Sequence, residues 1–447
     1  MRAPVLAQHE IKGMMMLVEA APQPEAPASS GLRPLDSGGT HETETLILAS
    51  AAAWCEGRLD RCLELARRAA AGGGATPADR DWARLAKVWH ATVLTRLGEL
   101  RHGSQLVAQA LAGDGTNPSD RLLAAATLCR SEIALACGDL DDAVTTARDG
   151  LKLAERAAVR TLLPMGHIVL AQSALRQGDM STLGTYANHL KDDALLGHTR
   201  FMPGRCSLTI TQLLEARDGT ASVAHLIESI TTDDRLLLEL LVAHPATASW
   251  LVRAAQKLDS RDLAAGVVFR AHGLAVCNPD FPLLYASALH AAGLFDESAE
   301  RLLAAEELHQ DMWAKASAAE DAGMMLAATT GDRDRAVAAL SRAADAYLAV
   351  GASRDVFRVN SKLRELGTRR RQVPRLTGRP TTCGGRLTDT EFAVAELVSQ
   401  GLTNARVGRQ LFISTHTVAF HLRKVFRKLG INSRVELAST WNQIATQ

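Results

Sequence analysis

The chain has 447 residues, which is too long for one compact core, so several domains or a repeat array are expected. Its composition is 47% hydrophobic but only 4% aromatic, and alanine and leucine dominate, which favours packed helices over a β-sheet core. The net charge of +1 gives no sign of a polyanionic partner for the chain as a whole, and no apolar run approaches the ~18 residues of a membrane span.

Residues 1–42 are rich in proline, serine and glycine and are predicted to be disordered. The apolar run MMMLV within them is too short, and too closely flanked by charge, to be a signal peptide. No Cys-x-x-Cys pair occurs, so the cysteines are interpreted as buried or free thiols in a reducing cytoplasm, with neither a disulfide framework nor a metal site. They are Cys55, Cys62, Cys129, Cys137, Cys206, Cys277 and Cys383.

Glycines recur about every 40 residues through the middle of the chain, each interrupting an Ala/Leu-rich helical pattern. The first steps are nearly equal in length, and a later gap of almost twice that length corresponds to two repeats. A turn without glycine is therefore expected near residues 257–261. The glycines are Gly57, Gly98, Gly138, Gly178, Gly219, Gly293 and Gly331.

This period predicts a helical hairpin in each repeat. Glycine ends the first helix because it adopts the left-handed conformation without a Cβ clash, and a second amphipathic helix then packs back on the first. Residues 59–69, 140–154 and 334–348 are examples of such second helices. Residues 43–367 are thus expected to form about eight hairpins stacked into a solenoid, which resembles degenerate tetratricopeptide repeats.

A basic, Pro/Gly-rich linker is expected at residues 368–386. From Arg369 to the C-terminus, 13 lysines and arginines oppose 4 acidic residues, so this end carries about +9 and the rest of the chain about −8. On charge alone, a solvated basic face and a polyanion-binding end are equally good interpretations.

Residues 387–447 are predicted to form four helices. Thr388 with Glu391 makes a capping box, and Gly401 closes the first helix. Thr403 caps a short helix over 404–411, and Ser414 caps a third that ends before Gly430. The fourth helix runs from residue 434 to about 444, after a cap at Ser433. A short helix, a tight turn and a longer basic helix make a helix-turn-helix arrangement.

The third helix has two distinct faces at 100° per residue. Its apolar stripe, which we expect to be buried, consists of Val418, Leu422, Val425 and Leu429. We interpret His421, beside this stripe, as a satisfied core histidine. The opposite face fits the major groove, where arginine reads guanine and phenylalanine contacts a thymine methyl. The predicted base-reading residues are His416, Ala419, Phe420, Arg423 and Lys424.

A second set of polar and basic residues is expected to contact DNA phosphates, because backbone contacts position a helix-turn-helix on the duplex. They are Thr403, Asn404, Arg409, Ser414, Thr415, Thr417, Arg427, Lys428 and Arg434.

Several motifs of this segment match one family. They are Leu387-Thr388-x-x-Glu391, Gly401-x-Thr403-Asn404, Ile413-Ser414-x-x-Thr417-Val418-x-x-His421, Lys428-Leu429-Gly430 and Ser433-Arg434-x-Glu436-Leu437. The segment 387–447 resembles the LuxR-type helix-turn-helix domain over nearly its whole length. It departs from the family pattern at Thr390, Gly408 and Ala419, so base preference cannot be copied from relatives. The resemblance implies a homodimer on double-stranded DNA that pairs through Leu437, Ala438 or Trp441 of the fourth helix.

The order of repeats and then a DNA-binding domain is similar to the large ATP-binding LuxR regulators, which also carry an N-terminal ATPase. No Gly-x4-Gly-Lys-[Ser/Thr] motif occurs here, so either the module is lost or the chain begins after it. No catalytic constellation occurs, and we expect no enzyme activity, no cofactor and no metal.

The sequence thus predicts an all-α, cytoplasmic transcription regulator whose repeats receive a protein or small-molecule effector, with RNA polymerase as a further partner and no membrane association. The alternative is a helical-repeat scaffold that its C-terminal domain only tethers to DNA.

Overall fold

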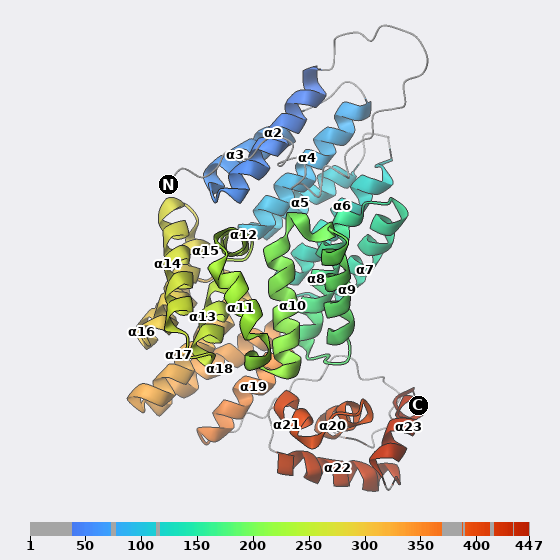
Figure 1. Cartoon of the computed structure of the whole chain (residues 1–447), viewed down its shortest axis with the longest axis vertical. Helices are drawn as coiled ribbons and strands as arrows, with labels where there is room; N and C mark the ends of the chain where they lie inside the picture. Colours follow the sequence, from blue (N-terminus) through green and yellow to red (C-terminus); the bar gives the residue numbers. More distant parts are fainter. Residues whose placement is uncertain are drawn as a thin grey trace. The chain divides into compact units, whose positions relative to one another are not determined.

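A computed structural model of the chain describes residues 38–72, 77–112, 117–368, 387, 389–411, 415–431 and 433–446. These residues form helices joined by short turns, with no strand among them, which confirms the all-α prediction (Figure 1). Residues 1–37 of the predicted disordered segment and 369–386 of the predicted linker lie outside the described residues. The first described helix begins at Gly38, so the end of that predicted disordered segment is helical.

The repeat region consists of eight consecutive helix pairs with two additional helices. The pairs are α2 (Gly38–Cys55) with α3 (Leu59–Ala71), α4 (Pro77–Arg96) with α5 (Leu100–Leu111), α6 (Asp120–Cys137) with α7 (Leu140–Arg156), α8 (Leu163–Gln177) with α9 (Leu183–Leu195), α10 (Pro203–Asp218) with α11 (Ala224–Thr232), α13 (Thr247–Lys257) with α14 (Arg261–Cys277), α15 (Pro282–Phe295) with α16 (Ala299–Leu308), and α17 (Met312–Met325) with α18 (Arg333–Ala349). The additional helices are α12 (Asp234–Ala243) and α19 (Ser353–Glu365).

Most of the turns inside these pairs contain a residue with positive φ. At Gly138, φ is 82°, and Asp139 then caps α7 by accepting a hydrogen bond from the Asp142 amide at 3.1 Å. The turn expected without glycine is present at Asp259, where φ is 55°.

The prediction for Gly293 is wrong. Its φ is not positive, because it lies inside α15, where an added Cβ would come within 2.9 Å of Leu302 Cδ2. The turn residue of this repeat is Glu297, with φ of 53°. The glycine at 293 therefore serves close helix packing rather than the turn.

Small side chains let the helices of neighbouring pairs pack closely. Helix α6 contacts both α4 and α7, and its Ala124, Ala125, Ala126 and Leu128 are all buried. A helix covered on several sides needs apolar residues around most of its circumference rather than along one stripe. This packing accounts for a core built largely from alanine and leucine. None of the described helices has the length and apolarity that crossing a bilayer requires.

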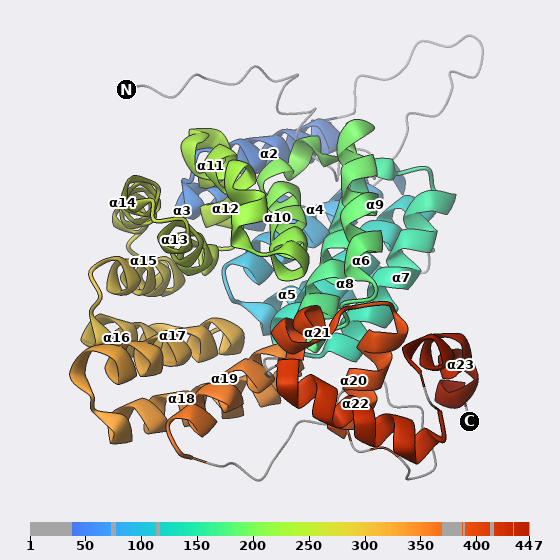
Figure 2. The same ribbon diagram turned by 60° about the horizontal axis from the view of Figure 1, so that its bottom comes forward.

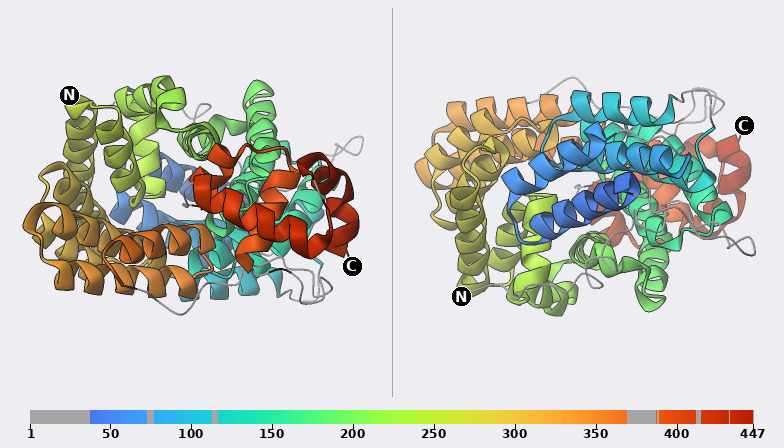
Figure 3. Two further views of the ribbon diagram at one scale, coloured as in Figure 1. Left: turned by 90° about the horizontal axis from the view of Figure 1, so that it is seen from below. Right: turned by 90° about the horizontal axis from the view of Figure 1, so that it is seen from above.

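The chain divides into two compact units. The first unit comprises residues 1–173 and 184–315, and the second comprises 174–183 and 316–447. In the first unit the array curves until late helices reach the first pair, and α12 packs on α2 (Figure 3). The buried Asn278, which follows α14, donates to the Gly57 carbonyl and accepts from the Leu59 amide, each at 2.9 Å. These bonds join the end of the sixth helix pair to the turn of the first.

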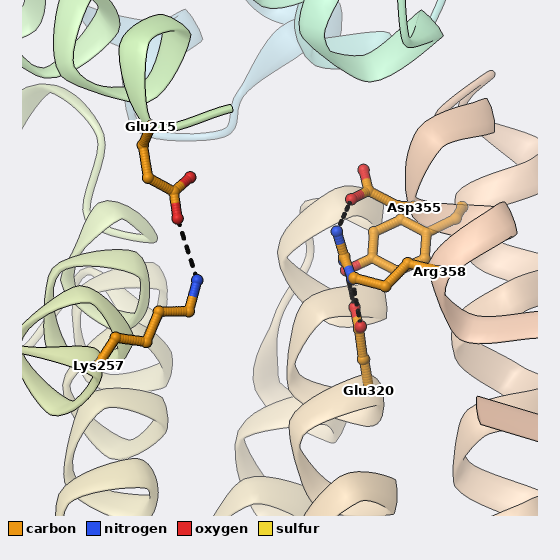
Figure 4. A network of polar contacts seen from close by, with 6 residues as sticks. Glu215, Lys257, Glu320, Asp355 and Arg358 are labelled. Carbon is orange, nitrogen blue, oxygen red and sulfur yellow. Dashed lines mark hydrogen bonds and ion pairs between the residues drawn. The ribbon is translucent and has the colours of Figure 1, made fainter. Parts of the chain in front are cut away.

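A polar network ties together the last repeat helices of the second unit (Figure 4). Arg358 on α19 donates to both carboxylate oxygens of Glu320 on α17, at 2.6 and 2.5 Å, and to Asp355 at 2.6 Å. Tyr347 on α18 donates its hydroxyl to Glu320 at 2.9 Å. One guanidinium thus bridges two buried carboxylates, with the bidentate geometry that makes such pairs strong.

Candidate nucleic-acid interface

Four helices form the C-terminal domain of the second unit. They are α20 (Asp389–Ser399), α21 (Asn404–Leu411), α22 (Thr415–Leu429) and α23 (Arg434–Thr446), and their starting residues and spacing follow the sequence prediction closely (Figures 1 and 2). Their shared core is apolar and includes Val394, Val398, Val407, Val418, Val425, Leu437 and Trp441.

Local hydrogen bonds fix where these helices begin and end. The Arg406 amide donates to Thr403 Oγ1 at 3.3 Å, and the Glu436 amide donates to Ser433 Oγ at 3.1 Å, so both predicted caps are confirmed. Gly401 and Gly430 end their helices with φ of 86° and 71°. The predicted caps at Thr388 and Ser414 lie outside the described residues.

Helix α22 presents the two faces that its sequence predicts. Val418, Leu422 and Val425 are buried in the domain core, and Leu429 packs at the edge of that core. On the other side, Phe420 is 46% exposed. Arg423 and Arg427, on the same side, are also exposed. An aromatic ring and two guanidiniums therefore face outward from a helix whose opposite face is packed in the domain core.

The exposed phenylalanine is held by its neighbours on the helix. Lys424 Nζ lies 4.4 Å from the centre of the Phe420 ring, a cation–π contact one helical turn along. The His421 ring meets Phe420 edge-on, with 5.6 Å between ring centres. These two contacts orient the Phe420 ring in the absence of DNA, and the Lys424 side chain points toward that ring. Ala419, also predicted to read bases, is partly buried beside them.

His421 differs from the satisfied core histidine expected from the sequence. Its ring is half-buried, and among the described residues its buried Nδ1 has no hydrogen-bond partner. Burial lowers the pKa of His421 below its usual value of about 6.5, so the ring is neutral at pH 7.

Two of the residues expected at phosphates also hold the domain together. Lys428 Nζ forms an ion pair with Glu391 at 2.6 Å, and Glu391 is only 3% exposed. Arg434 donates to the Leu402 carbonyl and, at 3.3 Å, to Asn404 Oδ1, which fixes the start of α21. Sequence reasoning missed both pairings, because the partners come from different helices and lie far apart along the chain.

The other predicted phosphate contacts fall into two groups. Thr403 and Thr415 are exposed at the starts of α21 and α22. The side chains of Arg409 and Thr417, and the whole of Ser414, lie outside the described residues, as does the side chain of His416, which was predicted to read bases.

The expected pairing surface on α23 requires a correction. Leu437 is fully buried, and the Trp441 ring packs against Phe392 with 5.1 Å between ring centres, so both side chains belong to the core of their own domain. Of the three predicted residues only Ala438 is exposed. Val435, which sequence reasoning missed, is 78% exposed one turn before it. Its position nearly opposite Leu437 on the helix was the available signal.

The C-terminal part of the chain is similar to known regulatory proteins. Residues 386–441 match the family model described as bacterial regulatory proteins, luxR family. A provisionally named HTH-type transcriptional regulator of Mycobacterium tuberculosis is 49% identical over 59 residues, which are 13% of this chain and 7% of the relative. A nitrate/nitrite response regulator protein homolog of Haemophilus influenzae is 47% identical over 49 residues, 11% of this chain and 24% of the relative.

The helical repeats have neighbours among solved structures. A Rap protein complexed with competence and sporulation factor aligns over 90% of this chain and 99% of its own, at 11% identity and a TM-score of 0.43.

The sequence relatives are matched over a small part of their own length. Residues 386–441 are therefore a helix-turn-helix domain of the luxR family of bacterial regulatory proteins.

Proposed function

We propose that the protein is a sequence-specific transcription regulator that reads the major groove with α22. The observation that carries the proposal is the outward face of this helix, where Phe420, Arg423 and Arg427 are exposed while the opposite face is buried. Arginine can donate bidentately to guanine, and a phenylalanine ring can contact a thymine methyl. Footprinting of the full chain on its own upstream DNA tests the proposal, which predicts one protected site.

Arg423 is expected to carry sequence information rather than general affinity. Replacing it with alanine should weaken binding to the cognate site by about 1–3 kcal/mol and relax one base position. The measurement is binding by fluorescence anisotropy to the cognate duplex and to single-base variants of it. An equal loss of affinity on every duplex would assign Arg423 to the phosphates instead.

Arg427 and Lys428 should differ although they are neighbours in sequence. Arg427→Ala is expected to lower the slope of log affinity against log salt by about 1, because one phosphate contact is lost. Lys428→Ala should change the slope less and lower the stability of the domain, because it leaves Glu391 buried without its cation. The salt series and the melting temperatures of both variants separate the two roles. Equal slopes and unchanged melting would refute the distinction.

Dimerisation on DNA is part of the same proposal, with the exposed Val435 and Ala438 of α23 at the pairing surface. Two domains would then occupy half-sites about one helical turn, or about 10 base pairs, apart. The repeats would receive the signal in the cytoplasm, and RNA polymerase would be the partner of the DNA-bound form.

A scaffold function is the second candidate, and an exposed apolar surface favours it. Phe269 and Val276 on α14 and Tyr285 on α15 are all more than half exposed, and the two helices pack together. Phe269 and Val276 are seven residues apart and so lie on one face of α14, and apolar residues that gather on one exposed face are typical of protein-binding surfaces. The two candidates differ in operator preference: a regulator binds its upstream site better than a shuffled duplex, whereas a tethered scaffold binds both alike.

A further inference from the structure

A cluster of charged side chains from four helices of the first unit lies between the early and the late repeats. Arg96 comes from α4, Glu132 from α6, Arg205 from α10 and Glu239 from α12. Contacts of α4 with α6 and of α10 with α12 bring these helices together (Figure 2). Arg205 is only 3% exposed, and its Nη2 donates to Glu132 at 2.6 Å.

The two guanidiniums have more donors than acceptors. Among the described residues, Nε and Nη1 of Arg205 and Nε and Nη2 of Arg96 are buried without hydrogen-bond partners. Burial, and next the positive charge of Arg205, lower the pKa of Arg96 from its usual value. An arginine stays protonated in a protein, and a buried donor without an acceptor is costly. Two of these donors belong to Arg205, which bonds Glu132 on α6, and two to Arg96 on α4, which packs on α6. Together they indicate a missing acceptor with negative charge.

Glu239 is an example of an oxyanion bound within this cluster. Its Oε2 accepts a hydrogen bond from the Gly204 amide at 2.5 Å, near the start of α10. A Cβ at Gly204 would clash with this oxygen, so the close approach needs a glycine. The carboxylate therefore binds the backbone and leaves the spare guanidinium donors unused.

We propose that the interior of the first unit binds a small ligand through an oxyanion group, a carboxylate or a phosphate, which accepts hydrogen bonds from Arg96 and Arg205. As the effector site of the regulator, this inference rests on the proposed function; as a binding site it stands alone.

The charge of the cluster depends on Glu239. Burial raises the pKa of Glu239 to about 7, against the opposing effects of Arg205, the Gly204 amide and Arg96. Burial also raises the pKa of Cys55 on α2 to about 11 and that of Cys129 on α6 to about 12, so these neighbouring thiols are neutral. Burial raises the pKa of the Cys206 thiol on α10 as well. On α14, the charged residue that reaches α12 is Arg270, which pairs with the exposed Asp234. As pH falls from 8 to 6, Glu239 takes up a proton and the cluster becomes more positive, so binding of an anion whose own charge is constant over this range should strengthen.

Calorimetric titration of the full chain with sodium phosphate, and separately with sodium acetate, tests the site at constant ionic strength set by sodium chloride. We expect one of the two anions to bind saturably. Acetate stays ionised from pH 6 to pH 8 and should bind tighter at pH 6, whereas phosphate takes up a proton itself in this range, so its binding is compared with that of Glu239→Gln at each pH. Phosphate binding alone would identify a phosphate ligand, and acetate binding alone a carboxylate. If neither anion binds, the proposal is overturned.

Three variants separate the site from nonspecific charge. Arg205→Gln should weaken binding at least tenfold, whereas Arg217→Gln, an exposed arginine on the same helix, should not change it. Because Arg205→Gln could disturb folding, Glu239→Gln provides a second arm: it should bind either anion more tightly than the unchanged protein at pH 8 and about equally at pH 6. Equal binding by all variants would overturn the site. Anion binding that persists without any effect on DNA affinity would keep the site and reject its role as the effector site.

Discussion

Replacing Trp441 with alanine is expected to remove much of the stability of the C-terminal domain in the full chain. The ring is almost completely buried against Phe392, and removing a buried tryptophan costs about 3–5 kcal/mol. A domain of about 60 residues has a stability of about 3–9 kcal/mol, so this loss removes much of it. Hydrogen–deuterium exchange should show lost protection in peptides from α20 to α23, with protection retained in α2 to α7.

The matched control is Val435→Asp on the same helix. This residue is exposed, so the fold and the exchange pattern should be unchanged. If α23 pairs two domains, the charge should abolish binding to a duplex with two half-sites and spare binding to a single half-site. The opposite result, in which Trp441→Ala keeps its protection and loses only pairing, would restore the interface expected from the sequence.

Local signals in the sequence predicted most of the fold. Regularly spaced glycines located five successive turns, because positive φ is a local property that residue type reports directly. The prediction at Gly293 failed because a glycine can serve either a turn or a close approach of two helices. Only the contact with Leu302 distinguishes the two.

At the interface, sequence patterns predicted directions but not partners. The 100° geometry placed Phe420 and Arg423 outward and Val418 and Val425 inward, as the structure shows. It could not show that Lys428 is paired with Glu391, because that contact depends on how α22 crosses α20. Leu437 was assigned to a pairing surface by resemblance, although its apolar stripe with Trp441 equally predicted a core.

The second large effect is expected at Arg358. Its guanidinium holds two buried carboxylates, Glu320 and Asp355, which come from different helices (Figure 4). In Arg358→Ala these carboxylates lose their shared cation while they remain largely dehydrated. Since the arginine side chain is about a third exposed, we expect a cost of about 2–4 kcal/mol, below the full cost of breaking a buried pair. Hydrogen exchange should accelerate in peptides from α17 to α19.

Lys257→Ala gives the matching case of an ion pair near the surface. Lys257 is well exposed and bonds Glu215 at 3.0 Å, so its loss should cost at most about 1 kcal/mol. The contrast tests whether the buried cation holds the last repeat helices together. Equal, small effects of both substitutions would mean that water replaces the guanidinium at Glu320. In that case the packing of α18 on α19, both of which carry buried apolar residues, would have to hold this end of the repeats without the ion network.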